Sequence, residues 1–589
     1  MLLYIHLIFM HTHERILSML LILHECFGDV LGFCDNGTYD DSVNTYQLLA
    51  DYIKFSVDYK VDPCEDFYQF ACGNWKRNTK EEPPYGGEIS SLQKLDQNFE
   101  EQQKKLLRSK TKSDSKAIQL ARDFYQKCVS AEEAWNSTKT SGIIYVMEKI
   151  KEFGVFPMLS EDTVDEAKLN ASFDLMWLLA YFNQNRTVLH RIAPRIVRDR
   201  YMDKAEISFY PSRDVFSFLA EPYAGKLKEQ FTEFLLSLMK LIAEDIGVNY
   251  HETFAPPHIL ELQKFMEKLH AIPVPNLELL LPNDNYFDYE SDFRNLSKVD
   301  RTTYSVNWTE YFLLVAPEEV HDYILEDPEV LVPDDRYIER FNKVLSEASP
   351  KTITNYVMVQ YILSWLPLLE ERYSRLVQMF AANAGETVPT ARDDLCFFEA
   401  KEHFELAITS MYARSASKKV PKSLIENMVI GILKEFKGQI EESKWMDNEF
   451  KEVVLLKLHK LRWKLLDDEL FYNNAALDAH YSDYAGMENL SFLHAEEWLT
   501  HKNKIQSFIR LIEIRDAKAE FENFSVMGYR ANAYYYRPSN MINMYVCVIS
   551  QTGRSRGSLH ALYWLSSEKL NPIWDSPWRC RFSQKGISH

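Results

Sequence analysis

Apolar residues recur at helical spacing through most of the interior of this chain. In segment 231–248 they form one broad face that ends at Gly247, a residue type that commonly follows the last turn of a helix. The same pattern predicts further helices over residues 92–128 (with a polar break at 109–115), 258–270, 349–366, 368–382, 397–413, 423–442 and 447–465. No internal repeat, low-complexity tract or glycine-rich phosphate loop interrupts them. The sequence therefore predicts a mainly α fold.

Length and composition indicate an ordinary globular protein. The 589 residues are enough for two or more domains, and 46% apolar with 26% charged residues is typical of a chain with packed cores. Acidic residues outnumber basic ones by 86 to 67, which gives a formal net charge of −19. Such a charge argues against nucleic acid or an anionic membrane surface as a partner. The sequence gives no indication of the oligomeric state.

The N-terminus suggests an exported protein. Residues 1–10 are largely apolar, residues 11–15 are polar, and an apolar run follows from Ile16 to Leu23. Neither run reaches the roughly 20 residues of a spanning helix, but the second, after Arg15 and before small residues near Gly28, is typical of a signal peptide. We predict a signal peptide over residues 1–28 and a secreted protein. A short signal anchor that leaves the rest of the chain outside the cell is the alternative.

Glycosylation sequons and cysteines agree with export. Asn-x-Ser/Thr triplets, which mark candidate glycosylation sites, occur at Asn36, Asn136, Asn170, Asn185, Asn295, Asn307, Asn489 and Asn523. The eight cysteines are Cys26, Cys34, Cys64, Cys72, Cys128, Cys396, Cys547 and Cys580. An even number of cysteines in a chain that begins with a predicted signal peptide predicts disulfides.

Several motifs resemble one family of peptidases. Residues 61–75 read Val-Asp-Pro-Cys-Glu-Asp-Phe-Tyr-Gln-Phe-Ala-Cys-Gly-Asn-Trp and resemble the signature that opens the ectodomain of neprilysin and endothelin-converting-enzyme-like zinc metallopeptidases. Further landmarks follow in family order, namely residues 308–312, Asn355-Tyr356, Cys396, Trp445-Met446-Asp447, and Asn532-Ala533-Tyr534-Tyr535 with Pro538 and Asn540. The last group resembles the strand that binds the substrate backbone. The resemblance covers about residues 60 to 550.

The resemblance implies a domain plan and one disulfide. It implies a connector over 29–65, a large multi-helix cap domain over 66–455, and the start of a thermolysin-like α+β catalytic domain over 456–550, whereas the tail 551–589 matches nothing in the family. It also implies a Cys128–Cys396 disulfide. Cys64 and Cys72 pair in relatives with cysteines that this chain lacks, so they are left free, joined to each other, or bonded to Cys547 and Cys580. Many members are type II membrane proteins.

The zinc-binding motif of the family is absent from the 589 residues. In His-Glu-x-x-His the two histidines lie on one helical face and the glutamate activates a zinc-bound water. The three His-Glu dipeptides, at positions 13, 24 and 251, have Leu17, Gly28 and Ala255 where the second histidine is required. The inverted form fails because Glu399 stands where Glu402-His403 would need a histidine. We therefore predict no catalytic residue, no metal ligand and no cofactor bound by this chain, although the family uses zinc.

Three functional hypotheses follow. In the first, the chain is a secreted or membrane-anchored relative of these metalloendopeptidases whose 589 residues do not hydrolyse peptides. Asn532 and Ala533 match the substrate-binding positions of the family. In the second, it is a truncated product or faulty gene model of an active metalloendopeptidase. In the third, it is a non-catalytic peptide-binding or decoy protein. The chain also departs from the family at residues 544–547, where relatives usually have a Pro-Ala-Gly segment.

Overall fold

The computed structural model describes sixteen stretches of the chain. They are residues 53–79, 91–109, 115–159, 173–183, 195–198, 205–209, 225–248, 255–273, 293–303, 305–332, 335–383, 391–416, 422–466, 469–512, 533–536 and 540–545. The chain divides into two compact units. The first combines residues 1–119, 404–480 and 521–589, and the second combines residues 120–403 and 481–520. The predicted signal peptide and the tail 551–589 lie outside the described residues.

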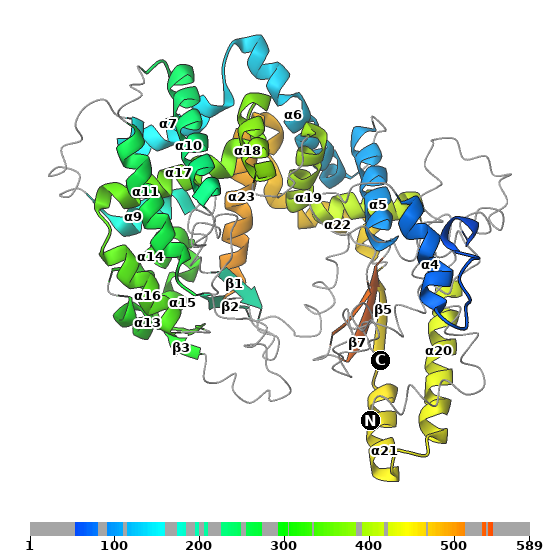
Figure 1. Ribbon diagram of the computed structural model, residues 1–589. Coiled ribbons are helices and arrows are strands. Elements are labelled where there is room, and N and C mark those ends of the chain that lie inside the picture. Colours follow the sequence, from blue (N-terminus) through cyan, green and yellow to red (C-terminus); the bar gives the residue numbers. More distant parts are fainter. Residues whose placement is uncertain are drawn as a thin grey trace, which may run out of the picture. The chain divides into compact units, whose positions relative to one another are not determined.

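The second unit is a helical assembly (Figure 1). Its helices are most of α6 (Lys116–Thr138), then α7 (Gly142–Phe153), α9 (Leu175–Asn183), α10 (Gly225–Ile246), α11 (Ala255–His270), α13 (Leu296–Thr302), α14 (Trp308–Val315), α15 (His321–Leu325), α16 (Asp335–Ser346), α17 (Pro350–Trp365), α18 (Glu371–Asn383) and α23 (Phe492–Ile509). Helix α17 is at the centre, because it contacts α7, α9 and α11 and buries residues on every face. Ser349 begins it by accepting a hydrogen bond from the Thr352 amide at 3.1 Å, and Pro350 occupies its first turn.

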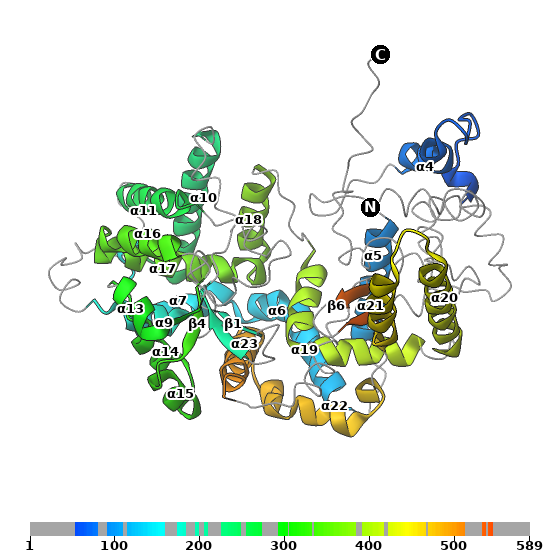
Figure 2. The same ribbon diagram turned by 90° about the horizontal axis from the view of Figure 1, so that it is seen from below.

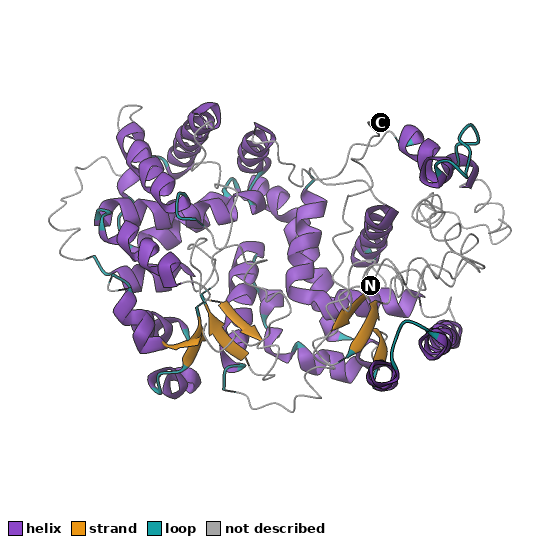
Figure 3. Cartoon of the chain, turned by 60° about the horizontal axis from the view of Figure 1, so that its bottom comes forward, coloured by secondary structure: helices purple, strands orange, loops and turns teal. Residues whose placement is uncertain are grey.

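A small mixed sheet belongs to the same unit. Its strands are β1 (Arg195–Arg198), β2 (Ala205–Ser208), β4 (Glu329–Leu331) and β3 (Phe293–Asn295), in the order β1-β2-β4-β3. The β1–β2 and β3–β4 pairs are antiparallel and the β2–β4 pair is parallel. Ile207, Val330 and Leu331 are buried, so the sheet contributes to the core. Among the described residues, strands form only this sheet and one other (Figure 3).

The first unit contains the beginning and the end of the family resemblance. Its helices are α4 (Phe67–Asn78), α5 (Ser91–Arg108), α20 (Lys422–Glu442), α21 (Asn448–His459) and α22 (Asn474–His480). Helices α20 and α21 lie side by side as a hairpin (Figures 1 and 2). Asp447 begins α21 by accepting a hydrogen bond from the Phe450 amide at 2.7 Å. Strands β5 (Arg462–Leu466), β7 (Met541–Tyr545) and β6 (Ala533–Tyr536) form a sheet in the order β5-β7-β6.

Helix α19 (Arg392–Ala416) contributes to both units. Its residues up to His403 belong to the second unit and those from Phe404 belong to the first. Phe404 has φ −119° and ψ 33°, which is outside the helical region, so the helix is kinked at the point where the units divide.

The mainly helical prediction is confirmed, and one predicted helix is wrong at its end. We expected helix over 447–465, but α21 ends at His459 and residues 462–466 form β5. The Arg462 amide donates a hydrogen bond to the Asn540 carbonyl oxygen at 2.9 Å, which starts the pairing of β5 with β7. Pairing with a segment about 80 residues away overrides the local helical pattern. The domain boundaries at 66, 455 and 550 remain predictions. No helix within the described stretches has both the length and the apolar character needed to cross a bilayer.

Candidate functional site

The family signature forms a capped helix and the loop before it. Asp62 accepts a hydrogen bond from the Cys64 amide at 2.8 Å, and Asp66 begins α4 by accepting one from the Gln69 amide at 2.9 Å. The carboxylate of Asp58 accepts from the Lys60 amide, which is the largest cause of its lowered pKa, and it also pairs with Arg77. These contacts fold the loop onto the helix.

The two signature cysteines differ in state. Cys64 is exposed and free, whereas Cys72 is buried and disulfide-bonded. The pairing of Cys64 with Cys72 is therefore excluded. The disulfide partner of Cys72 lies outside the described residues.

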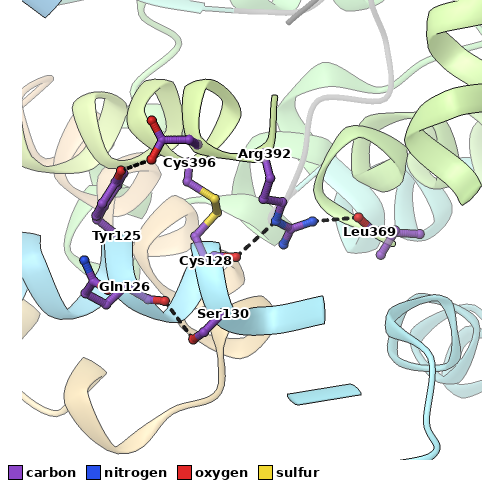
Figure 4. Close-up of a disulfide and its surroundings, with 8 residues drawn as sticks. Tyr125, Gln126, Cys128, Ser130, Leu369, Arg392 and Cys396 are labelled. Carbon is purple, nitrogen blue, oxygen red and sulfur yellow. Dashed lines mark hydrogen bonds between the residues drawn. A yellow bond between two sulfur atoms is a disulfide. The ribbon is translucent and has the colours of Figure 1, made fainter. Parts of the chain in front are cut away.

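The Cys128–Cys396 disulfide is present, as the resemblance implied. It joins α6 to α19 with a Cα–Cα distance of 5.5 Å, and both cysteines are fully buried (Figure 4). The guanidinium of Arg392 lies beside it and donates to the carbonyl oxygens of Cys128 and Leu369 at 3.1 and 2.6 Å. Burial lowers the pKa of Arg392. The Tyr125 hydroxyl donates to Asp393, which adds a second link between the two helices.

The predicted substrate-binding strand is at an edge of its sheet. Within the described residues, β6 pairs only with β7, and its first residue, Ala533, is opposite Met544. Asn532 lies outside the described residues. Asn540 has a positive φ of 51° at the start of β7, and its side-chain amide donates to the Lys457 carbonyl oxygen at 2.8 Å. An edge strand offers backbone donors and acceptors that an extended peptide can pair with.

The described residues contain one group of side chains with the chemistry of a metal site. It consists of Glu399, His403 and Glu496, whose nearest donor atoms all lie within 4.8 Å of one another. The group belongs to the second unit and does not form the His-Glu-x-x-His arrangement. Its residues therefore do not fit the zinc that catalysis in this family uses. The Glu399–His403 spacing of four is visible in the sequence, but nothing in the sequence connects it to Glu496, which is almost a hundred residues further on.

Four of the eight sequon asparagines lie in described stretches. Asn136, Asn295, Asn307 and Asn489 are all exposed. Asn295 and Asn307 precede the first turns of α13 and α14, where Asn307 accepts a hydrogen bond from the Glu310 amide at 3.1 Å. The other four, Asn36, Asn170, Asn185 and Asn523, are outside the described residues. Glycosylation of these sites remains a prediction.

Comparison with known proteins finds similarity across most of the chain. The chain is 23% identical over 523 residues to neprilysin-1 of Caenorhabditis elegans. The aligned residues cover 86% of this chain and 66% of that relative. It is 24% identical over 518 residues to membrane metallo-endopeptidase-like 1 of Mus musculus, with 84% and 64% covered. The chain thus spans less than two-thirds of the length of these curated relatives.

A solved structure has the same fold at low sequence identity. The zinc metalloprotease Zmp1 of Mycobacterium tuberculosis, in complex with an inhibitor, aligns with a TM-score of 0.59 and 14% identity, over 84% of this chain and 69% of that one. The sequence profile of Peptidase family M13 matches residues 63–466, which is more than half of the chain. The signature helix, the disulfide and the edge strand thus occur in a chain that belongs to peptidase family M13.

Proposed function

We propose that this chain binds extended peptides along β6 without hydrolysing them. The observation that carries the proposal is that β6, among the described strands, lies at the edge of the β5-β7-β6 sheet, in a segment that resembles the substrate strand of the family. A peptide laid beside this strand would exchange main-chain hydrogen bonds with it. The Asn532 amide would add a side-chain contact to the peptide backbone, and Ala533 would supply main-chain groups.

The absence of hydrolysis rests on the missing motif. Peptide hydrolysis by a zinc enzyme requires a metal that polarises the scissile carbonyl and lowers the pKa of its bound water, together with a carboxylate that takes the proton. The 589 residues contain no His-Glu-x-x-His segment that would place these groups on one helix. The residues present support peptide positioning and not bond cleavage.

A second candidate is that the same residues form part of an active metalloendopeptidase. Two observations favour it. The chain spans less than two-thirds of its relatives' length, and Cys64 has an exposed thiol where the family resemblance implies a disulfide. Sequencing the complete transcript tests this candidate, because an in-frame His-Glu-x-x-His segment downstream of the β6 codons would establish it.

We place the chain outside the cell. The buried Cys128–Cys396 disulfide is typical of proteins from oxidising compartments, and the four described sequon asparagines are exposed and so accessible to glycosylation. Secretion is the preferred route, and a type II membrane protein with an extracellular ectodomain is the alternative.

Peptide binding can be measured by fluorescence polarisation with labelled extended peptides and the purified full chain. We expect saturable binding, and we expect Asn532→Ala to weaken it at least tenfold because the variant removes the predicted contact to the peptide backbone. Asn448→Ala is the matched control, since it removes an amide from an exposed residue of α21 in the same unit. It should bind like the unaltered chain.

The same preparations test for cleavage. Incubation with zinc and a peptide library, followed by mass spectrometry, should reveal no cleavage that a chelator abolishes. Chelator-sensitive cleavage by the 589-residue chain would refute the non-hydrolysing part of the proposal. Equal peptide affinity for the Asn532→Ala and Asn448→Ala variants, or no saturable binding at all, would refute the assignment of the peptide to β6.

A further inference from the structure

Three side chains from two helices converge inside the second unit. Glu399 and His403 are four residues apart on α19, so they lie on the same face of that helix, and Glu496 comes from α23. The Nε2 atom of His403 lies 2.9 Å from Oε2 of Glu496, and both side chains are only 2% exposed. Glu399 is half-buried and completes the group.

Further hydrogen bonds orient the side chains of His403 and Glu496 in this group. The Nδ1 atom of His403 lies 3.0 Å from the side-chain nitrogen of Asn503. The side-chain oxygen of Asn503, Oδ1, accepts a hydrogen bond from the hydroxyl of Tyr484. On the other side, the Thr500 hydroxyl donates to Oε1 of Glu496 at 3.3 Å. These outer contacts fix the imidazole and the carboxylate, as the outer contacts of metal ligands do in proteins.

An aromatic ring packs against the His403 imidazole, and a disulfide lies one helical turn before Glu399 on α19. The Phe124 ring lies 5.5 Å from the His403 imidazole and 5.7 Å from the Phe492 ring. Cys396, which is bonded to Cys128 of α6, lies three residues before Glu399 on α19. The His403 and Glu496 side chains are thus shielded from solvent, and the disulfide restrains α19 next to the cluster.

We propose that Glu399, His403 and Glu496 bind a zinc ion that joins α19 to α23. An imidazole nitrogen with carboxylate oxygens is a donor set that zinc accepts, whereas magnesium and calcium select oxygen ligands alone. Two carboxylates and a neutral imidazole carry a charge that a divalent cation balances. A water or a second carboxylate oxygen would complete four-coordination.

The geometry requires only small movements. In a tetrahedral site with zinc–ligand distances near 2.0–2.1 Å, neighbouring donor atoms are about 3.3 Å apart. The 2.9 Å separation between Nε2 of His403 and Oε2 of Glu496 therefore needs to widen slightly. The carboxylate oxygen of Glu399, which lies within 4.8 Å of both atoms, needs to come closer to them. Rotation about the side-chain bonds of Glu399 and Glu496 would provide both changes.

Metal binding would also change which nitrogen of His403 carries the proton. With the Tyr484 hydroxyl donating to the Asn503 carbonyl oxygen, the Asn503 amide donates to Nδ1, and the neutral imidazole carries its proton on Nε2, directed at Glu496. Zinc on Nε2 requires the proton on Nδ1 instead. The Asn503 amide would then reverse, so that its oxygen accepts from Nδ1 and its nitrogen donates to the Tyr484 oxygen.

The proposal is tested by zinc titration of the metal-stripped full chain. We expect one zinc ion per chain at this site, and we expect Glu399→Gln to weaken its binding at least tenfold. The matched control is Glu402→Gln, which changes an exposed glutamate on the same helix outside the group. It should bind zinc within twofold of the unaltered chain. Equal affinities for the two variants, or no zinc uptake by the unaltered chain, would overturn the proposal.

Two measurements on the unaltered chain keep the test independent of variant folding. Cobalt in place of zinc should give the d–d absorption of a low-coordinate nitrogen and oxygen site without a thiolate charge-transfer band, which excludes binding by a cysteine such as Cys64. Hydrogen exchange should slow on zinc addition in peptides that contain His403 and Glu496. A thiolate band, or unchanged exchange in both peptides, would also overturn it.

Discussion

Tyr311 shows how burial changes the chemistry of a single residue. Its ring packs against Trp308 and Phe312 in the second unit, and its hydroxyl oxygen accepts a hydrogen bond from the Asn183 amide at 2.5 Å. Desolvation is the main cause that raises the pKa of Tyr311 to about 12, although the hydrogen bond from Asn183 opposes it. The folded chain therefore favours the neutral phenol more strongly than the unfolded chain does.

This raised pKa makes the folded state sensitive to alkali. The contribution of Tyr311 to stability is complete below pH 10, where the phenol is neutral in both states, and it is lost as pH rises toward 12. We expect Tyr311→Phe to reduce the fall in unfolding free energy between pH 10 and 12 by up to about 3 kcal/mol. Urea unfolding followed by circular dichroism at several pH values measures the difference.

Tyr68→Phe provides the control for this experiment. Tyr68 is 54% exposed on α4, so its loss should leave the pH dependence close to that of the unaltered chain. The interpretation of Tyr311 fails if both variants show the same slope.

Between elements, the α6–α19 contact of the second unit combines a disulfide with hydrogen bonds. The disulfide closes a loop of 268 positions, and Arg392 stacks near Trp135 and Phe492 while it bonds two carbonyl oxygens. The candidate zinc ligands on α19 follow within seven residues of Cys396. Covalent, polar and aromatic contacts thus converge on the part of α19 before its kink.

Removal of the disulfide should lower stability substantially. In the chain-entropy account a loop of this length contributes roughly 5 kcal/mol, and relaxed strain and residual structure reduce the measured value, so we expect a loss of about 2–5 kcal/mol for the double variant Cys128→Ala with Cys396→Ala. Differential scanning calorimetry under non-reducing conditions measures it. Cys64→Ser, which removes an exposed free thiol, should unfold like the unaltered chain. A double variant as stable as Cys64→Ser would contradict this account.

Across the whole molecule, the helices differ widely in how much they bury. Twelve of the sixteen residues of α17 are buried, whereas α21 buries none and exposes Val453 and Leu456 by more than half. Buried helices open rarely, and exposed helices open locally at little cost. The second unit therefore has a well-packed centre, whereas α21 of the first unit contributes no buried residue.

Hydrogen exchange followed by mass spectrometry should separate these helices. We expect the amides of α17 to exchange at least a hundredfold more slowly than those of α21, because exchange from α17 requires much of its unit to unfold. Helix α20, which contacts α21, serves as the comparison and should resemble α21 more than α17. Similar protection in all three helices would show that the hairpin is stabilised by contacts that its burial does not reveal.

The sequence predicted local features well and long-range ones poorly. Helical spacing located α10, α11, α17 and α20, and the resemblance implied the Cys128–Cys396 disulfide. Strand β5 was missed because its pairing partner, β7, is about 80 residues away. The three-residue cluster was missed for the same reason, since Glu496 joins Glu399 and His403 only after α23 packs beside α19. Contacts of this kind depend on tertiary packing and leave no periodic signal in the sequence.

Among the described strands β6 has a neighbour on one side only, so its other side can also pair with a second molecule of this chain. A strand whose backbone groups can receive a foreign segment can receive the same strand from a second molecule, and the run Tyr534-Tyr535-Tyr536 has the aromatic composition that such pairing favours. Ligand capture and self-association would then compete for one set of backbone groups. The chain without a bound peptide is accordingly the form most prone to aggregate. A peptide paired with β6 would occupy the same backbone groups and so keep the chain in solution.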